Sequence, residues 1–504
     1  MKTFRSLVLC GCLLPLPLLA QTPGAGPKLA ARDGKPPHVL SRRLERRASV
    51  DRFFRLHQEQ LQRHGQATTA LSGADSLHTG WTRLFASAAS AADDGAADIA
   101  VDDSGNAYVT GSSSQLPFGQ DYVTIKYSPS GSVLWLARFD GGTNGEDAAK
   151  AIAVDRFHNV YVTGSSALNA GEADYATVKY NAAGIEQWVA RYSGPVRLFN
   201  RPTGLVVDTA GNVYITGWSR VTYDASHYVT IKYDPLGHEL WVAHYAGQDP
   251  GYDDASGIGV DRAGNVYVTG TSSVMNVGSV AATVKYNANG TEQWVRRYAG
   301  PGGSSAGASA LALDGSGNIL ITGDSYGPGT SDDFTTIKYD SSGTQLWIAR
   351  YDGGMSNGDQ ATAIATDAEG NVYVCGASIG GPPISYDIAT IKYDAHGVQQ
   401  WAERYAGPGQ YYDWPHRLAV DRWHNVIVSG TSTGASYDYL TIKYDSAGAQ
   451  LWVMRYDGTG NSSDESYAVA LNDSGDVYVT GGTCSTGINY DYATVKYSSA
   501  GIQQ

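Results

Sequence analysis

The sequence contains very little cysteine, which excludes a fold held together by disulfide bonds. Only four cysteines occur in 504 residues, and two of them, Cys10 and Cys12, fall in an apolar segment at the N-terminus. The other two, Cys375 and Cys484, stand in non-adjacent copies of a repeat that is described below. Because a disulfide between them is not expected, packing and hydrogen bonding alone must stabilise the fold.

The sequence also lacks an apolar run long enough to cross a membrane as a helix. The run Leu7–Leu19 is short and contains two prolines, Lys2 and Arg5 precede it, and Ala20 follows as a small residue suited to cleavage. This pattern predicts an export signal over residues 1–20. We therefore expect a secreted, periplasmic or cell-surface protein with no membrane span.

Positive charge is scarce in most of the chain. The net charge is −13 and residues 1–80 are net positive, so the acidic excess lies in residues 81–504 and argues against nucleic acid as a partner. Residues 21–78 form a basic linker, in which Ser41–Gly65 is predicted to be an amphipathic helix. Its apolar stripe comprises Leu40, Leu44, Val50, Phe54 and Leu61. A mobile leader and a docking helix both remain open interpretations.

Glycine and tyrosine, by contrast, are abundant, with 61 and 34 copies, and they recur in one short word. The word GNVYVTG stands at Gly264–Gly270, and close or looser copies begin at Gly105, His158, Gly211, Gly317, Gly370, His424 and Gly475. Its second residue recurs at spacings of 53, 53, 53, 53, 53, 54 and 51 residues. Such a period predicts a repeat architecture.

Each repeat contains two further words. The word T-[IV]-K-Y carries a lysine, at Lys126, Lys179, Lys232, Lys285, Lys338, Lys392, Lys443 and Lys496. A tryptophan follows nine residues after each of the first seven, at Trp135, Trp188, Trp241, Trp294, Trp347, Trp401 and Trp452. The alternating segments predict four strands per repeat, and D-x-x-[GH]-N and Y-[DNS]-x-x-G are turn sequences that suit hairpins.

The eighth repeat lacks its fourth strand, and the missing strand is found at the other end of the repeat region. The segment GWTRLF, with Trp81 and Phe85, matches LWLARF, with Trp135 and Phe139. We therefore predict an all-β fold, a single eight-bladed β-propeller of four-stranded antiparallel blades over residues 79–504. The ring is closed by the N-terminal strand, and we expect a monomer.

The repeat word A-x-A-I-A-V-D-x-x-G-N-V-Y-V-T-G, followed by D-[YF]-x-T-[IV]-K-Y, resembles the bacterial SBBP (β-propeller repeat) family. That resemblance implies an exported or surface protein and no common enzymatic role. A second, partial likeness is that of Tyr339–Trp347 (YDSSGTQLW) to the tryptophan-docking turn of eight-bladed quinoproteins. It would imply a quinone, a calcium site and a catalytic aspartate, but the adjacent-cysteine disulfide of that family is absent.

No catalytic residue is predicted. Two matches to G-x-S-x-G, at Gly376–Gly380 and Gly430–Gly434, lack the helix that a nucleophile elbow needs. His158 and His424 replace glycine in two turns, and they are either metal ligands or tolerated turn residues. Every residue type that could act as an acid, a base or a nucleophile recurs around the ring. No unique acid or base is therefore predicted.

The eight lysines are predicted to be structural, because a lysine in the middle of a blade is costly unless it is paired. Turn carbonyls are one candidate set of partners. The carboxylates that end each first strand are the other, namely Asp102, Asp155, Asp208, Asp261, Asp314, Asp367 and Asp421, with Asn472 in the eighth copy.

Two rings of aspartates are candidate ligand or cation sites. One ring precedes the first strands, at Asp94, Asp147, Asp253, Asp359, Asp413 and Asp464; the other precedes the third strands, at Asp121, Asp174, Asp333, Asp387, Asp438 and Asp491. Both rings are expected at one end of the propeller, where the arc of blades 6–8 and 1–2 is fully acidic. The candidate site lies in that arc, which excludes Asp253 and Asp333. The aspartates either cap loop backbone or bind Ca²⁺ or a cationic or polyhydroxylated ligand, for which Tyr122, Tyr175, Tyr439 and Tyr492 would offer stacking surface.

The sequence therefore favours an exported, non-catalytic binding or scaffold protein whose partner is a protein, a carbohydrate or a small cation. The alternative is a propeller enzyme. Within that class, a quinoprotein-like oxidoreductase is favoured over a hydrolase or lyase.

Overall fold

A computed structural model of the chain describes residues 80–501 except 87–92, 115–118, 143–144, 170–171, 197, 355–356, 381–384, 410, 459–461 and 485–488. The chain divides into two compact units, Met1–Leu71 and Ser72–Gln504. The predicted export signal and the helix predicted over Ser41–Gly65 lie outside the described residues. Within the described part, no helix has the length and apolar character that a membrane crossing requires.

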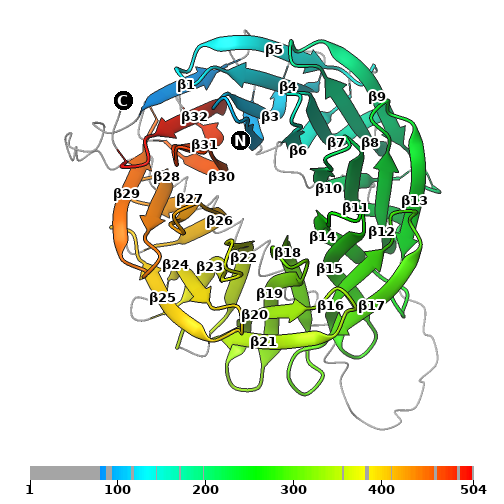
Figure 1. The fold of residues 1–504 in the computed structure, drawn as a ribbon, viewed down its shortest axis with the longest axis vertical. Coiled ribbons are helices and arrows are strands. Elements are labelled where there is room, and N and C mark those ends of the chain that lie inside the picture. Colours follow the sequence, from blue (N-terminus) through cyan, green and yellow to red (C-terminus); the bar gives the residue numbers. More distant parts are fainter. Residues whose placement is uncertain are drawn as a thin grey trace, which may run out of the picture. The chain divides into compact units, whose positions relative to one another are not determined.

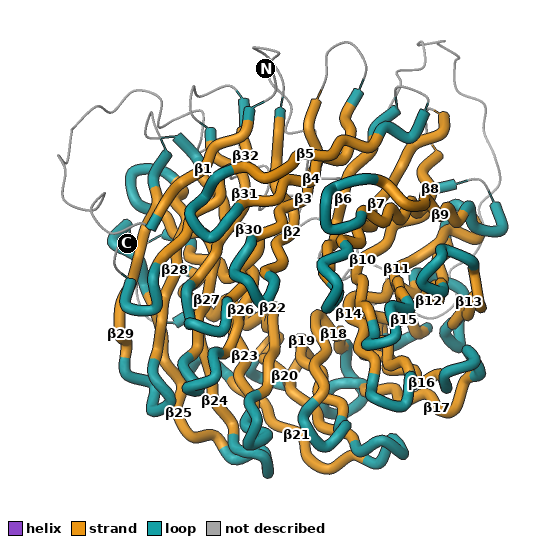
Figure 2. The backbone as a smooth tube through the Cα atoms, turned by 45° about the horizontal axis from the view of Figure 1, so that its top comes forward, coloured by secondary structure: helices purple, strands orange, loops and turns teal. Residues whose placement is uncertain are grey.

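The second unit consists of eight four-stranded antiparallel sheets (Figures 1 and 2). The innermost strand of each blade, from blade 1 to blade 8, is β2 (Asp94–Val101), β6 (Asp147–Val154), β10 (Asn200–Val207), β14 (Asp253–Val260), β18 (Ala306–Leu313), β22 (Asp359–Thr366), β26 (Asp413–Val420) and β30 (Asp464–Leu471). The second strands are β3 (Ala107–Ser114), β7 (Val160–Asn169), β11 (Val213–Thr222), β15 (Val266–Val274), β19 (Ile319–Gly327), β23 (Val372–Ile379), β27 (Val426–Thr433) and β31 (Val477–Thr483).

The third strands carry the lysines, and they are β4 (Gln120–Tyr127), β8 (Glu172–Tyr180), β12 (Ala225–Tyr233), β16 (Gly278–Tyr286), β20 (Ser331–Tyr339), β24 (Tyr386–Tyr393), β28 (Tyr437–Tyr444) and β32 (Asp491–Tyr497). The outermost strands are β5 (Val133–Phe139), β9 (Glu186–Tyr192), β13 (Glu239–Tyr245), β17 (Glu292–Tyr298), β21 (Gln345–Tyr351), β25 (Gln399–Tyr405), β29 (Gln450–Tyr456) and, in blade 8, β1 (Trp81–Phe85). The predicted eight-bladed propeller is thus confirmed.

The repeated words form the hairpins for local reasons. In blade 4, the Asp261 carboxylate accepts hydrogen bonds from the backbone N–H groups of Ala263 and Asn265, both at 2.9 Å. Gly264 then adopts a φ of 79°, in the left-handed region that glycine enters without strain. His158 and His424 adopt the same conformation in blades 2 and 7, with φ of 60° and 65°.

The lysine and tryptophan words join each blade to the next. Lys232 and Trp241 lie opposite each other on β12 and β13, and both donate to the carbonyl oxygen of Ala288 in the next blade, at 3.2 and 3.1 Å. Gly290 of the same turn has no room for a side chain, because a Cβ there would lie 2.6 Å from Trp241 Cδ2. The turn sequence is therefore required by contact with the preceding blade.

This lysine–tryptophan clamp recurs around the ring. All eight tryptophans donate to such a turn carbonyl, at Pro129, Ala182, Pro235, Ala288, Ser341, Ala395, Ser446 and Ser499. Seven of the lysines donate to one as well. Lys126 instead lies over the ring of Tyr108, with its Nζ 4.8 Å from the centroid. Of the two sets of partners that the sequence predicts, turn carbonyls are the common one.

Ion pairs between these lysines and first-strand carboxylates form only where a tyrosine is missing. In five blades the carboxylate accepts a hydrogen bond from the tyrosine hydroxyl of the second strand, as Tyr267 donates to Asp261 at 3.0 Å. Leu320 and Ile427 replace that tyrosine in blades 5 and 7, and there the lysine pairs with the carboxylate: Lys338–Asp314 at 2.9 Å and Lys443–Asp421 at 3.1 Å. In blade 8, Lys496 pairs with Asp476 rather than with Asn472.

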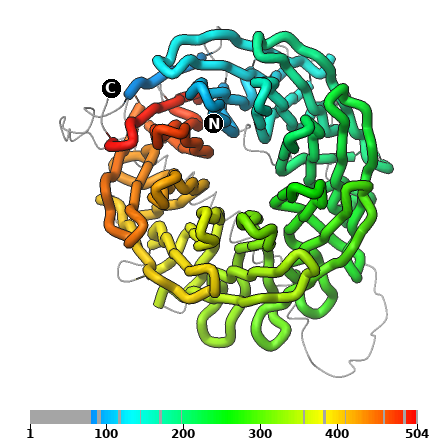
Figure 3. Tube along the Cα trace, viewed as in Figure 1, coloured from blue at the N-terminus to red at the C-terminus, as the bar shows by residue number. Residues whose placement is uncertain are grey.

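The ring is closed by the first strand of the described chain. Strand β1 pairs with β32, and Trp81 stands opposite Lys496. Both side chains donate to the carbonyl oxygen of Pro129 in blade 1, at 3.0 and 3.4 Å, so the clamp is complete at the junction of the two ends. Figure 3 shows the blue strand beside the red one at this point.

We expect Trp81→Ala to destabilise the protein strongly. Trp81 is 8% exposed and packs against Tyr127 and Tyr478, so its removal leaves a cavity where the ends of the ring meet. Truncating a buried tryptophan costs about 3–5 kcal/mol. Urea unfolding measures the change, and Leu84→Ala on the same strand is the control, because Leu84 is 49% exposed. Equal losses in the two variants would contradict closure through Trp81.

We expect Lys338→Met to cost more stability than Lys285→Met. Lys338 is 3% exposed and is paired with Asp314, so its removal strands a buried carboxylate, which costs about 3–5 kcal/mol. Lys285 is half-buried and bonds a turn carbonyl without an ion pair. Differential scanning calorimetry of the two variants checks this order, and a similar fall in both would show that the ion pair adds nothing.

Candidate functional site

The two predicted rings of aspartates come together at the junctions between blades. Three groups have carboxylate oxygens within 4.8 Å of one another: Asp121–Asp140–Asp147, Asp333–Asp352–Asp359 and Asp438–Asp457–Asp464. Each group contains one member of each ring and a third aspartate that follows the outermost strand. Sequence reasoning missed this third aspartate, although the words FDGG, YDGG and YDGT contain it.

The ring that begins the innermost strands caps loop backbone. Asp147 accepts from the N–H groups of Gly141 and Ala167, at 2.6 and 3.1 Å, and Asp359 accepts from Gly353 and Ile379. The same pattern of acceptance recurs at Asp94, Asp253, Asp413 and Asp464. The geometry thus agrees with the capping interpretation of this ring.

Most of the ring that begins the third strands is neutralised by arginine. Ion pairs join Arg138 to Asp121 at 3.1 Å, Arg404 to Asp387 at 3.0 Å and Arg455 to Asp438 at 2.7 Å, and Arg350 pairs with Asp333. Asp174 instead accepts from the Ser193 hydroxyl at 2.6 Å, and Asp491 begins β32. Each triad therefore holds its own counter-charge, and a calcium ion at these groups stays a prediction.

Several of these carboxyl groups have a raised pKa, and burial is the largest cause. This holds for Asp121, Asp147, Asp333, Asp359, Asp413 and Asp438. Asp457 and Asp464 rise furthest: burial, followed for Asp457 by its carboxylate neighbours, raises the pKa of each to about 6. Repulsion between neighbouring carboxylates adds to the effect of burial on these pKa values and is not the largest cause.

The tyrosines that were expected to offer stacking surface do not offer it. Tyr122, Tyr175, Tyr439 and Tyr492 are at most 1% exposed. Each packs inside its blade against an aromatic ring of the outermost strand, as Tyr122 does against Phe139 at 5.2 Å. That expectation is wrong, because the residue after each aspartate points into the blade.

A different aromatic set lies at the same end of the propeller, in blades 6–8. Its members are half-buried and stand at or near the starts of first and third strands: Tyr386, Tyr412, Trp414, Tyr437, Tyr467 and Tyr490. The rings of Tyr386 and Trp414 are 5.4 Å apart, and those of Tyr386 and Tyr412 are 6.1 Å apart. Glu465 lies among them and accepts from the Tyr467 hydroxyl at 2.7 Å. We call this set the aromatic patch.

A second set of unique residues lies on the innermost strands, which surround the axis in Figure 1. It comprises Asp98 on β2, Lys150 on β6, and His416 and Arg417 on β26, and these groups interact electrostatically. Burial, helped by Arg417 and Lys150, lowers the pKa of His416 to about 4, so its imidazole is neutral at pH 7. Its ring lies 5.5 Å from that of Tyr467, which connects this axial set to the aromatic patch.

The axial set overturns the sequence-based statement that no acid or base is unique. At the positions of His416 and Arg417, most other blades carry small residues: Ala97, Thr203, Ser256, Ser309 and Thr362 at the first, and Ala151, Gly204, Gly257, Ala310, Ala363 and Ala468 at the second. An alignment of the repeats shows these unique residues. They stand at positions that differ between blades, and the prediction rested on the positions that recur.

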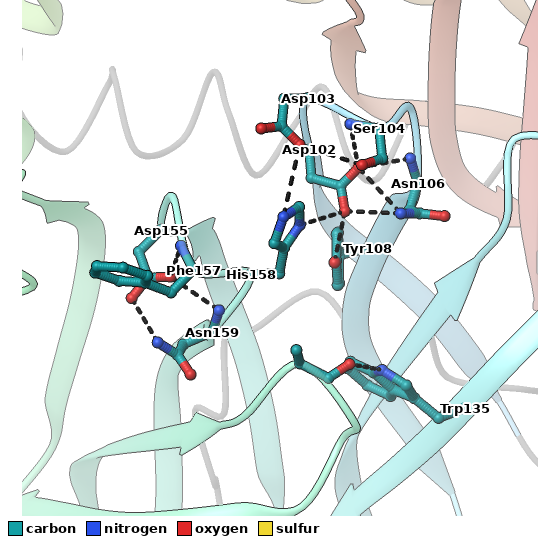
Figure 4. A network of polar contacts seen from close by, with 11 residues as sticks. Asp102, Asp103, Ser104, Asn106, Tyr108, Trp135, Asp155, Phe157, His158 and Asn159 are labelled. Atoms are coloured by element: carbon teal, nitrogen blue, oxygen red, sulfur yellow. Dashed lines mark hydrogen bonds and ion pairs between the residues drawn. The ribbon is translucent and has the colours of Figure 1, made fainter.

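The two turn histidines lie at the other end of the propeller and bind the preceding blade. His158 Nδ1 is 2.9 Å from Asp102 Oδ2, which also accepts from Asn106 and Tyr108 (Figure 4). His424 Nδ1 is 3.2 Å from Asp367 Oδ2 and 2.8 Å from Glu369 Oε2. Each histidine therefore links two blades, and the hydrogen bonds engage the same carboxylates that a metal would need.

Eight four-stranded blades, closed by a strand from the other end of the sequence, define a β-propeller. Three stretches of the chain, residues 80–118, 187–222 and 243–276, match the SBBP family, described as a β-propeller repeat. The resemblance that the repeat word suggested is thus confirmed at these three stretches.

Known proteins similar to this chain are distant. An uncharacterized WD repeat-containing protein L264 of Acanthamoeba polyphaga mimivirus is 25% identical, over 70% of this chain and 31% of its own length. The chain thus spans about a third of that relative. Two of the similar solved structures are a puromycin hydrolase (12% identity, TM-score 0.44, 77% of this chain and 58% of its own) and the Pseudomonas aeruginosa periplasmic gluconolactonase PpgL (11%, 0.41, 68% and 97%).

We expect the protein's stability to respond to pH through Asp457 and Asp464. Folding raises their pKa from 3.8 to about 6, so the folded state binds more protons than the unfolded chain between about pH 4 and pH 6. Their contribution to stability is therefore lost as the pH rises through that window. Asp457→Asn should gain about 1–3 °C in melting temperature over the parent between pH 4 and pH 7.

The matched control is Asp473→Asn, since Asp473 is an exposed turn residue. Its melting temperature relative to the parent should not vary with pH. A parallel pH dependence in both variants would show that the crowding of carboxylates at this junction has no energetic effect.

Proposed function

We propose that this protein is an exported, non-catalytic binding protein, and that the aromatic patch of blades 6–8 is where its ligand binds. The carrying observation is the concentration of half-buried aromatic side chains in three adjacent blades of an otherwise regular ring. Blades 3 and 4 carry Ser226 and Ser279 where blades 6 and 7 carry Tyr386 and Tyr437. The ring thus includes blades without an aromatic residue at this position, which supports a role of these rings in recognition.

The chemistry of the patch favours a polyhydroxylated ligand, that is, a saccharide. Tyrosine and tryptophan offer an apolar face together with a polar edge, which suits a ligand with apolar C–H faces and peripheral hydroxyls. Glu465 supplies acceptor oxygens beside Tyr437, Tyr467 and Tyr490. A small cation is less well suited, because the axial set next to the patch is predominantly basic.

The test is a fluorescence titration with neutral and acidic oligosaccharides, here cellotetraose and tetragalacturonate. We expect binding to the parent and an affinity at least tenfold lower for Trp414→Ala, because aromatic anchors dominate binding energy. Trp423→Ala is the control, since Trp423 is 46% exposed in a turn at the other end of its blade. No binding of either saccharide, or equal losses in the two variants, would refute the patch as a site.

Export is tested separately, by N-terminal sequencing of the protein recovered outside the cytoplasm. Cleavage after residue 20 is the expected result, and an intact Met1 in the exported protein would contradict the proposed signal.

A second candidate function is enzymatic, a hydrolase or lyase acting on the same ligand. The observation that favours it is the non-repeated set of titratable groups, in which neutral His416 lies beside Tyr467 and Glu465. Incubation with tetragalacturonate, followed by chromatography, would reveal cleaved products. An absorbance scan of the purified protein for a bound quinone tests the quinoprotein-like alternative, for which the described residues offer no comparable group.

A further inference from the structure

The axial set has an excess of positive charge that the fold does not require. Lys150 and Arg417 belong to blades 2 and 7, which are separated by blades 8 and 1. Each lies on an innermost strand and is exposed, and the positive charge of Arg417 acts on Lys150. Arg201, on β10 of blade 3, acts on Lys150 as a third positive charge. Both Lys150 and Arg417 are solvent-exposed, so a ligand can reach them.

Asp98 is the carboxylate of this set, and its oxygen atoms are already engaged. The Ile99 N–H donates to Oδ1 and the Ile152 N–H donates to Oδ2, both at 3.0 Å. Asp98 is thus held at the junction of blades 1 and 2 by two backbone groups. It acts on the basic residues only through space, and it forms no ion pair with them among the described residues.

The two basic side chains lack partners of opposite charge. Within the described part of the chain, Lys150 makes no hydrogen bond or ion pair, and Arg417 donates only to the carbonyl oxygen of His416, at 3.3 Å. Although Lys150 is exposed, desolvation by the strands around it, followed by the positive field of Arg417, lowers its pKa. Like charges held near each other without partners repel, which is costly. An anion that enters the axis would relieve that cost.

We infer that the axial set binds the carboxylate of an acidic saccharide, so that the ligand of the aromatic patch is a uronic-acid-containing chain. This inference rests on the proposed function and specifies its ligand. Trp414 and Arg417 lie on the same strand, and His416 contacts Tyr467, so the patch and the axial set are continuous. A chain lying on the patch therefore reaches Arg417 and Lys150.

The test is calorimetric titration with tetragalacturonate, cellotetraose and inorganic phosphate, each at 20 mM and at 150 mM salt. The variants are Lys150→Ala, Arg417→Ala, the double variant of these two, and Trp414→Ala. Most other blades carry small residues at both positions, so the variants should fold. Arg262→Ala is the control, because Arg262 is an exposed turn residue at the other end of its blade.

We expect tetragalacturonate to bind at least tenfold more tightly than cellotetraose, with an affinity that falls as salt rises. The double variant should lose that preference while it retains cellotetraose binding, and Arg262→Ala should lose neither. If both saccharides bind equally, or if the double variant keeps the preference for tetragalacturonate, the inference about the axial set is wrong. The aromatic patch then remains the proposed ligand site. If phosphate binds as well as tetragalacturonate and Trp414→Ala changes nothing, the axis is an anion site without a saccharide function.

Discussion

The structure depends on one hydrogen-bond acceptor per blade, the carbonyl oxygen in the turn before the outermost strand. The lysine and the tryptophan of the preceding blade converge on it, as Lys232 and Trp241 do on Ala288. The partner turn must be glycine-bearing, because the indole fills the place of a side chain at Gly290. The lysine word, the tryptophan and the glycine-bearing turn are therefore parts of one contact between successive blades. The contact recurs once per repeat because each repeat forms one blade.

The positions that make this contact tolerate substitution only in compensating sets. Where Leu320 and Ile427 replace a tyrosine, the carboxylate that loses its hydroxyl donor gains a lysine. In blade 8, Asn472 cannot serve as a carboxylate, so Tyr478 donates to Gly105 O at 3.1 Å and Lys496 turns to Asp476. Supplying a donor to the carboxylate of this turn is thus a constraint on each blade as a whole.

The fold could be predicted from the sequence because each repeat reports it independently. Strand alternation, turn residues and the displaced Trp81 strand all point to one closed ring, and the structure agrees. The partners of the lysines could be predicted only as two alternatives, since the choice depends on whether a tyrosine hydroxyl competes for the carboxylate. The partners of the aspartates likewise depend on the fold. Backbone N–H groups bind the ring at the innermost strands, and arginines from the outermost strands bind most of the ring at the third strands.

The candidate site could not be predicted in the same way, because it consists of departures from the repeat. Trp414, His416 and Arg417 lie close together on β26. In the sequence alone they resemble ordinary variation between repeats. Their significance depends on Lys150 and Tyr467, which the ring brings near from other blades. Periodicity identifies what the fold requires, and the residues that break it are what remains for recognition.

Closure by the Trp81 strand also has a consequence for how the chain matures. The last blade needs residues from both ends of the propeller sequence, so it cannot form until β32 has been synthesised. Pairing of β1 with β32 requires closure of a very long loop, and the entropy cost of that closure precedes the contacts that offset it. We therefore expect closure of the ring to be slow. Until then β32 keeps an unpaired edge, open to other strands or to proteases. A chain that lacks either β1 or β32 therefore keeps an open last blade with an unpaired edge.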